Sequence, residues 1–377
     1  MTPGNDTAEI DLQPLKESLR PAPDAPSEVP CEITVRTLDQ FSLNGETIVK
    51  TLAGIRWLCR GSQLLLCAPT GIGKSSLNMQ IAISFALGLP FFGIKPSGKL
   101  KVLIIQAEND DGDMAEFRDG IFRGMGLTKE QQAEACQRIQ VVYETVRTGG
   151  DFVALVAEVA AKHKPDLIIV DPLFSYLGDS VNEQKAVSTF LRNGLNPILQ
   201  EHDCGLILVH HTNKPPKGTE KLNWQGSDFA YLGSGTSELA NWARAVLVIR
   251  SIGSHEVFEV QLGKRGRRAG LVNDEGQPIY QFYIKHSTSG ICWEPATEDD
   301  LPSEDSTGRH AITIKDVVAT FGDGLVLQYS KLVEALIENH GVSDRTAKKA
   351  IARAKSEGKI CKAPSGVYEL SSQKGEQ

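Results

Sequence analysis

Residues 68–76 are of types, and in an order, that suit the binding of phosphate groups. They read Ala68, Pro69, Thr70, Gly71, Ile72, Gly73, Lys74, Ser75 and Ser76. Glycines let backbone N–H groups close around phosphates, the Lys74 ammonium reaches the β- and γ-phosphate oxygens, and the Ser75 hydroxyl is suited to ligate Mg²⁺. An apolar run (63–67) precedes the segment and a helix-like stretch (76–87) follows, so a helix dipole adds its positive end. We expect these residues to bind ATP and Mg²⁺, although Ala68 stands where the motif usually has glycine.

Two carboxylates follow apolar runs and supply the remaining groups that ATP hydrolysis needs. The run 167–170 ends at Asp171, which would hold Mg²⁺ directly or through water. Glu108 follows the run 101–106, at the edge of the sheet where ligands bind in open α/β folds, and we expect it to act as the general base. The alternatives are that Asp171 only caps a turn, and that Glu108 belongs to an acidic helix start with Asp110, Asp111 and Asp113.

A third apolar run, 205–209, leads into His210 and His211. A polar side chain just beyond a strand can sense the γ-phosphate, and we assign this role to His211. A zinc site is the alternative for a histidine pair, but no third ligand lies at a suitable spacing.

The arrangement of these runs predicts the fold class. From about residue 33 to 291 apolar runs alternate with amphipathic stretches, which is typical of βα units in a mostly parallel sheet flanked by helices. We expect parallel strands at 63–67, 101–106, 139–143, 167–170 and 205–209 and an antiparallel extension at 245–250 and 258–262.

Composition and charge divide the chain further. Residues 1–32 are proline-rich and predict a disordered tail, residues 33–295 the ATPase domain, and 296–308 an acidic linker, with a short tail at 372–377. The net charge of −7 leaves nucleic-acid contact to local basic patches. Seven scattered cysteines without CxxC spacing favour a cytoplasmic protein with reduced thiols, and no membrane span or signal peptide is expected.

Residues 309–371 form a second predicted module. Helices are expected at about 314–320, 329–338 and 343–355, followed by a hairpin at 360–370. Three helices and a hairpin resemble a winged helix-turn-helix, whose last helix enters the major groove of duplex DNA. Its contacts would come from Arg345, Thr346, Lys348, Lys349, Arg353 and Lys355. The alternative is a docking module for another protein.

The four motifs in order resemble the RecA-type P-loop ATPase core, in particular the branch of RepA-like hexameric plasmid helicases. These are Gly-Lys-Ser, Ala-Glu-Asn, Ile-Val-Asp and His-His-Thr-Asn-Lys, with a Phe-Gly turn at 90–93. The resemblance implies a homo-hexameric ring in which a neighbouring subunit inserts a basic finger into each ATP site. The candidates are Lys264, Arg265 and Arg267, whose spacing departs from the Lys-x-Arg of related helicases. It also implies that the loop 215–237 faces single-stranded DNA, with contacts from Lys214, Lys217 and Lys221.

These observations favour an ATP-dependent DNA motor of a plasmid, phage or other mobile element, either a helicase or a DNA-stimulated ATPase. The alternative is a non-motor protein whose DNA binding or recombination-mediator role is switched by ATP. A small-molecule kinase is disfavoured because no lid-like arginine pattern is present.

Overall fold

The computed structural model describes residues 35–43, 45–212, 237–252, 257–297, 300–301, 312–321, 326–340, 344–363 and 367–371. The predicted tails at 1–32 and 372–377, and most of the predicted linker, lie outside these ranges. Residues 35–43 belong to a unit of their own. It contains the 3-10 turn η1 (Leu38–Gln40), where the Thr37 N–H donates to the Gln40 side chain at 3.1 Å.

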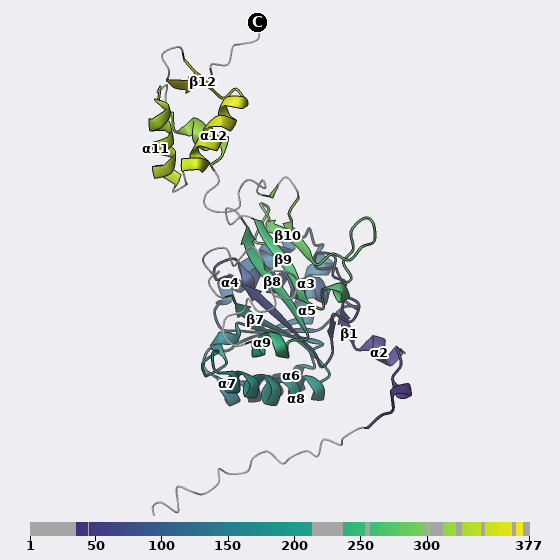
Figure 1. Ribbon diagram of the computed structural model, residues 1–377. Helices are drawn as coiled ribbons and strands as arrows, with labels where there is room; N and C mark the ends of the chain where they lie inside the picture. Colours follow the sequence, from purple (N-terminus) through teal and green to yellow (C-terminus); the bar gives the residue numbers. More distant parts are fainter. Residues whose placement is uncertain are drawn as a thin grey trace, which may run out of the picture. The chain divides into compact units, whose positions relative to one another are not determined.

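A nine-stranded sheet forms the centre of the main body, in the order β11-β10-β9-β8-β3-β7-β6-β4-β5 (Figure 1). Strands β8, β3, β7, β6, β4 and β5 pair in parallel, and β9, β10 and β11 extend the sheet in antiparallel fashion. The strands are β3 (Gln63–Ala68), β4 (Val102–Gln106), β5 (Ile139–Tyr143), β6 (Leu167–Asp171), β7 (Gly205–His211), β8 (Ala245–Ile252), β9 (Val257–Lys264), β10 (Gln281–His286) and β11 (Trp293–Pro295). The predicted α/β class is confirmed, but the prediction of an antiparallel strand at 245–250 was wrong, because β8 runs parallel to β3.

Both faces of the central strands β3, β4, β6 and β7 are covered, which is why these strands are buried along almost their whole length rather than on alternate residues. On β3, Leu64 and Leu66 pack into one core with α3 and α4, whereas Leu65 and Cys67 pack into a second core with α6 and α8. The helices of the body are α2 (Gly45–Val49), α3 (Lys74–Ala86), α4 (Asp111–Gly124), α5 (Lys129–Arg138), α6 (Gly149–His163), α7 (Gln184–Ser188), α8 (Asn196–Glu201) and α9 (Glu238–Trp242). A π-helical stretch (Thr189–Leu195) joins α7 to α8, and a small hairpin, β1 (Thr51–Ala53) and β2 (Leu58–Cys59), precedes β3.

Two glycines on α4 allow the turn before β11 to approach this helix closely. A Cβ added at Gly120 would lie 2.8 Å from the Ile291 nitrogen, and one at Gly124 would lie 2.8 Å from the Cys292 sulfur. Because the two glycines are four positions apart, they share one face of α4. That face therefore fixes the helix that follows Glu108 against the antiparallel end of the sheet.

Residues 312–371 contain three helices and a hairpin with a hydrophobic core of their own. The elements are α10 (Ile314–Ala319), α11 (Tyr329–His340), α12 (Asp344–Ser356), β12 (Ile360–Lys362) and β13 (Tyr368–Leu370). Val317, Leu336 and Ile351 are buried between the helices, and Tyr368 of the hairpin closes the core. None of the helices in the described ranges has the length and apolar composition that crossing a lipid bilayer requires.

Candidate active site

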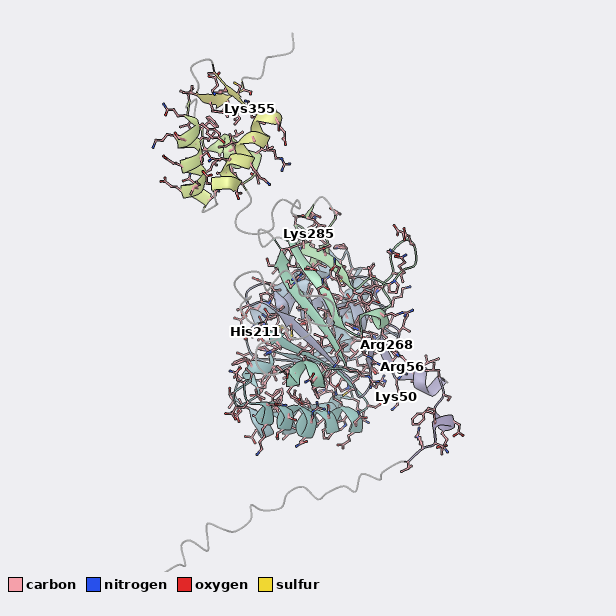
Figure 2. The ribbon with its side chains drawn as sticks, viewed as in Figure 1. Lys50, Arg56, His211, Arg268, Lys285 and Lys355 are labelled. Carbon is pink, nitrogen blue, oxygen red and sulfur yellow. The ribbon has the colours of Figure 1, made fainter. Side chains whose placement is uncertain are left out.

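The carboxyl ends of four parallel strands bring the sequence motifs to one edge of the sheet. Ala68, at the end of β3, pairs with His211 of β7, and Gln106 of β4 pairs with Asp171 of β6. The segment 69–76 leaves β3 at this edge, and Glu108 lies two residues beyond Gln106. His211 is labelled at this end of the strands in Figure 2.

The phosphate-binding segment turns sharply before α3. Gly71 and Gly73 have φ of 80° and 87°, a region that side-chain-bearing residues rarely adopt. Gly73 is the N-cap of α3, so the first N–H groups of the helix have no partner within the helix and are suited to bind an anion.

Lys74 lies in a buried position at the start of α3. Its Nζ donates to the Pro69 carbonyl at 2.8 Å, within its own loop. Burial lowers the pKa of Lys74, and the nearby carboxylates of Asp171 and Glu108 act in the opposite direction. A bound phosphate group would replace the Pro69 carbonyl as the hydrogen-bond partner of the Lys74 ammonium and would compensate for the water that burial removes.

The predicted metal ligands Ser75 and Asp171 are hydrogen-bonded to each other through their side chains. Asp171 is 5% exposed, and its Oδ2 accepts a bond of 3.0 Å from Asn78 Nδ2. Burial raises the pKa of Asp171 and the charge of Glu108 adds to this, whereas the bonds from Asn78 and Ser75 lower it. A carboxylate and a hydroxyl are oxygen donors that suit Mg²⁺. In the described part of the chain no three His, Cys, Asp or Glu side chains cluster to hold a metal.

Glu108 is held in a turn that Gln106 organises. The buried Gln106 Oε1 accepts from the N–H groups of Glu108 and Asn109, at 3.1 and 2.8 Å, and its Nε2 donates to the Asn109 carbonyl at 2.7 Å. The exposed Glu108 carboxylate lies near enough to act electrostatically on Lys74 and Asp171.

The acidic residues after Glu108 have a separate structural task. Asp110 and Asp113 form a capping box at the start of α4, with backbone-to-side-chain bonds of 3.1 and 2.9 Å. Glu108 takes no part in this cap. Its position is therefore not explained by the helix start.

His211 is half-buried and contacts the phosphate-binding loop. Its Nδ1 lies 3.2 Å from Thr70 Oγ1, within hydrogen-bonding distance. Burial lowers the pKa of His211 and the charge of Lys74 lowers it further, whereas the charge of Glu108 raises it. The contact links the end of β7 directly to the loop.

The basic finger candidates lie at the amino ends of the parallel strands, whereas the phosphate-binding loop of the same chain lies at their carboxyl ends. Lys264 pairs with Val246 near the start of β8, so Arg265 and Arg267 follow at the amino ends of β8 and β3. Figure 2 shows Arg268 and Arg56 at the end away from His211. The Lys264 ammonium donates to the carbonyls of Ala240, Asn241 and Ala243, at 2.9, 3.2 and 2.6 Å, and so holds the end of α9.

Arg265 lies within a group of arginines. Burial lowers the pKa of Arg265, and the charges of Arg244 and Arg268 lower it further. Its NH1 atom is buried without a hydrogen-bond partner among the described residues. Such a group is suited to receive an anion that another molecule supplies.

Two supporting residues escaped the sequence analysis. Asn78, four residues after Lys74 on α3, orients Asp171, and Gln106 orients the Glu108 turn. The signal for Asn78 was its position one helical turn after Lys74, and the signal for Gln106 was its place as the polar residue that ends an apolar strand. The loop 215–237, with Lys217 and Lys221, falls almost wholly outside the described residues, as does Lys214.

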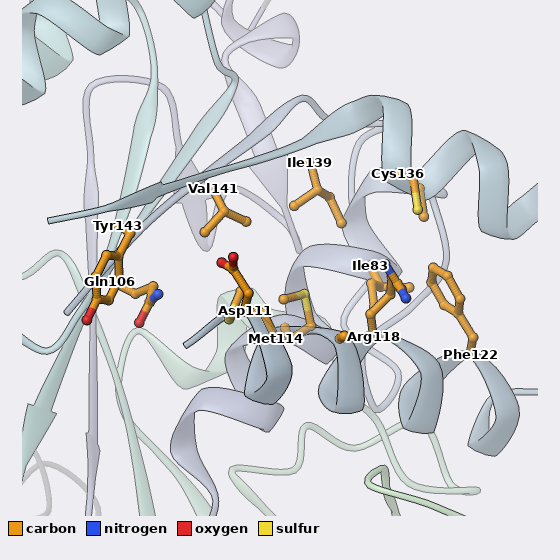
Figure 3. Close-up of a pocket in the computed structure, with 13 residues that line it drawn as sticks. Ile83, Gln106, Asp111, Met114, Arg118, Phe122, Cys136, Ile139, Val141 and Tyr143 are labelled. Atoms are coloured by element: carbon orange, nitrogen blue, oxygen red, sulfur yellow. The ribbon is translucent and has the colours of Figure 1, made fainter. Parts of the chain in front are cut away.

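A cavity of about 400 Å³ opens beside the Glu108 turn, between α3, α4 and β5 (Figure 3). Met79, Met114 and Tyr143 are among its lining residues, and Asp111 points into it. None of the predicted site residues lines it. It adjoins the phosphate-binding edge through Gln106, which lines the cavity and also orients the Glu108 turn.

Replacing Asn78 with alanine should shift the acidic limb of Mg²⁺-dependent ATP hydrolysis to higher pH. The bond from Asn78 favours the Asp171 carboxylate, so its loss raises the pKa of that group further and leaves less metal-binding carboxylate at a given pH. A bond to a charged group contributes about 1.5–3 kcal/mol, so its loss should displace the acidic limb measurably. The pH profile of Ser84→Ala, a buried polar residue elsewhere on α3, should match that of the wild type. An unchanged profile for Asn78→Ala would remove Asn78 from the site.

Comparison with models of protein families matches residues 32–217 to the family described as AAA domain. A comparison with curated proteins found no match. The matched segment includes the phosphate-binding loop and the strands that end near Glu108, Asp171 and His211. Residues 32–217 are therefore similar to the AAA domain family, and the mostly parallel sheet with helices on both faces is consistent with a RecA-like fold.

Proposed function

We propose that the protein is an ATP-hydrolysing motor that acts on DNA, related to RepA-like replicative helicases of plasmids, phages or other mobile elements. The observation that carries this proposal is the convergence of Lys74, Asp171, Glu108 and His211 at one sheet edge, with an arginine group at the other. One subunit then offers a nucleotide site on one side and a finger on the other. Such a subunit is suited to a ring.

Each residue at the edge has a distinct task in hydrolysis. Lys74 would exchange the Pro69 carbonyl for phosphate oxygens, and Ser75 and Asp171 would hold Mg²⁺. When bound, Mg²⁺ supplies positive charge that neutralises the β- and γ-phosphates. The Glu108 carboxylate would accept the proton of the attacking water. His211, through Thr70, would respond to loss of the γ-phosphate and pass it to the residues after β7.

The finger would act on the ATP site of a neighbouring subunit. Arg265 and Arg267 are the candidates, because Lys264 is already bound to the end of α9. The planar guanidinium suits the charge that spreads over a phosphoryl group in the transition state. We propose a homo-hexamer on this basis, with single-stranded DNA in its channel near Lys214, Lys217 and Lys221.

The C-terminal helices and hairpin are proposed to be a winged helix-turn-helix that binds duplex DNA. Lys349 and Lys355 are exposed on α12. Lys348 and Arg353 form ion pairs with Asp344 and Glu357 of the same region, at 2.8 and 3.1 Å, so part of the positive charge is neutralised locally. The side chain of Arg345 lies outside the described residues.

Single-stranded DNA should stimulate ATP hydrolysis by the wild-type protein, which should also unwind a forked duplex. Glu108→Gln should still bind ATP but lose about 10²- to 10⁴-fold in kcat, because the general base is removed. Lys74→Ala should lose binding as well, and Asp111→Asn, the control at a neighbouring carboxylate, should keep full activity. Normal turnover by Glu108→Gln would contradict its role. Stimulation without unwinding would favour a non-motor, ATP-switched DNA-binding or recombination-mediator protein.

Mixing two inactive variants tests whether the finger acts between subunits. Arg265→Ala should bind ATP normally yet lose about 10³-fold or more in kcat, as expected for an arginine finger. Lys74→Ala subunits bind no ATP but carry an intact Arg265. Rings assembled from both should recover part of the hydrolysis activity. No recovery, with mixed assembly shown by native mass spectrometry, would exclude a finger at Arg265; the same mixture with Arg267→Ala examines the other candidate.

Removing residues 309–377 should weaken binding to duplex DNA by about tenfold or more, because several phosphate contacts are lost together. Basal ATP hydrolysis should stay at the wild-type level. Fluorescence anisotropy with a labelled duplex, at two salt concentrations, measures the change and its salt dependence. Unchanged affinity would identify the module as a docking site for another protein.

A further inference from the structure

Two aromatic residues from the antiparallel end of the sheet support the phosphate-binding loop from outside it. Trp293 Nε1 donates to Ser76 Oγ at 3.1 Å, and Ser76 Oγ donates to the Gly73 carbonyl at 2.8 Å. The Ser76 hydroxyl is thus engaged on the side of β11, whereas Ser75 bonds to Asp171. The two adjacent serines therefore have different tasks.

A second contact fixes the same face of α3 to β11. The Gln80 side chain pairs with both backbone groups of Trp293: Nε2 donates to the Trp293 carbonyl at 2.9 Å, and Oε1 accepts from its N–H at 2.8 Å. Ser76 and Gln80 are four residues apart and lie on one side of the helix. The first two turns of α3 are therefore bound to one residue of the sheet.

His286 completes this support from β10. It pairs in register with Trp293, and the two rings have centroids 4.0 Å apart. Its imidazole hydrogen-bonds to the backbone of Ile72. A Cβ added at Gly73 would lie 3.2 Å from His286 Cε1 and 3.3 Å from a ring carbon of Trp293, so the two rings lie directly against the loop.

The loop needs such support because of its own electrostatics. In a loop suited to bind phosphate the backbone N–H groups gather around the anion, and in the absence of the anion such parallel dipoles repel one another. Contacts from a rigid sheet hold the converged conformation in advance, and a ligand then does not have to order the loop when it binds.

We propose that Trp293 and His286 are positioning residues that hold the loop at Ile72–Ser76 in its phosphate-binding conformation before the nucleotide arrives. The expected consequence of this support is a higher affinity for ATP, and this consequence rests on the proposed function. The preformed loop itself exists without nucleotide and is measured separately.

Trp293→Phe tests the proposal, with Trp242→Phe as the matched control. Both substitutions keep a ring and remove one indole hydrogen bond at a buried site, since Trp242 Nε1 donates to Asn196 Oδ1 at 2.9 Å in the core of the other face. Trp293→Phe should weaken binding of a non-hydrolysable ATP analogue about three- to tenfold, the range expected for one lost hydrogen bond. It should raise KM while leaving kcat unchanged. Trp242→Phe should change neither.

Hydrogen exchange of the nucleotide-free protein gives the second measurement. The amides of residues 71–76 should exchange faster in Trp293→Phe than in the wild type or Trp242→Phe. His286→Phe, which keeps a ring beside Trp293 and removes the bond to Ile72, should act in the same direction and serves if Trp293→Phe does not fold. Exchange and affinity equal to those of the control would overturn the proposal. If the wild-type protein bound no ATP analogue, the proposed function would fail, and the exchange comparison would still decide the positioning role.

Discussion

Parallel pairing between β3, β7, β6 and β4 is the constraint on which the site depends. Parallel strands end on the same side of the sheet, so residues that follow different strands meet although they are far apart in the sequence, as Ala68 and His211 are. The register places Ala68 opposite His211 and Gln106 opposite Asp171. A slip of one residue in either pair would turn these side chains to the other face, into one of the two buried cores.

Burial and charge act against each other at this edge. Lys74 and Asp171 are both buried, which disfavours the charged form of each, and their mutual attraction restores part of what burial removes. Glu108 raises the pKa of Asp171 and supports the charge of Lys74 at the same time. An arrangement with more negative than positive groups favours the entry of a cation, and Mg²⁺ accompanies ATP. The arginine group at the other edge has the opposite imbalance and favours an anion. In the proposed ring the two imbalances would be complementary between subunits.

The antiparallel strands β10 and β11 support the phosphate-binding loop as well as enlarging the sheet. Trp293 and His286 contact the loop, and the turn before Trp293 packs on the glycines of α4. The extension therefore touches both the segment that binds phosphate and the helix that follows Glu108. Movement of the phosphate-binding loop or of α4 would therefore displace contacts made by β11 or by the turn before it.

The sequence by itself determined the local chemistry and the class of fold. The types and spacing of Gly71, Gly73 and Lys74 predict a phosphate site. The apolar runs that end at Asp171 and near Glu108 predict buried parallel strands. These features are local, because strand and loop conformation depend on neighbouring residues. The parallel direction of β8 was missed, since an apolar run carries no information on its orientation. Only the tertiary structure showed the hydrogen bonds from Asn78 to Asp171 and from Trp293 to Ser76, because the packing of whole elements brings these segments together. The bond between Gln106 and the Glu108 turn depends on the geometry of that turn. The tertiary structure also decided that Arg265 lies away from the loop of its own chain, because strand order and direction, and not residue spacing, set which edge a residue occupies.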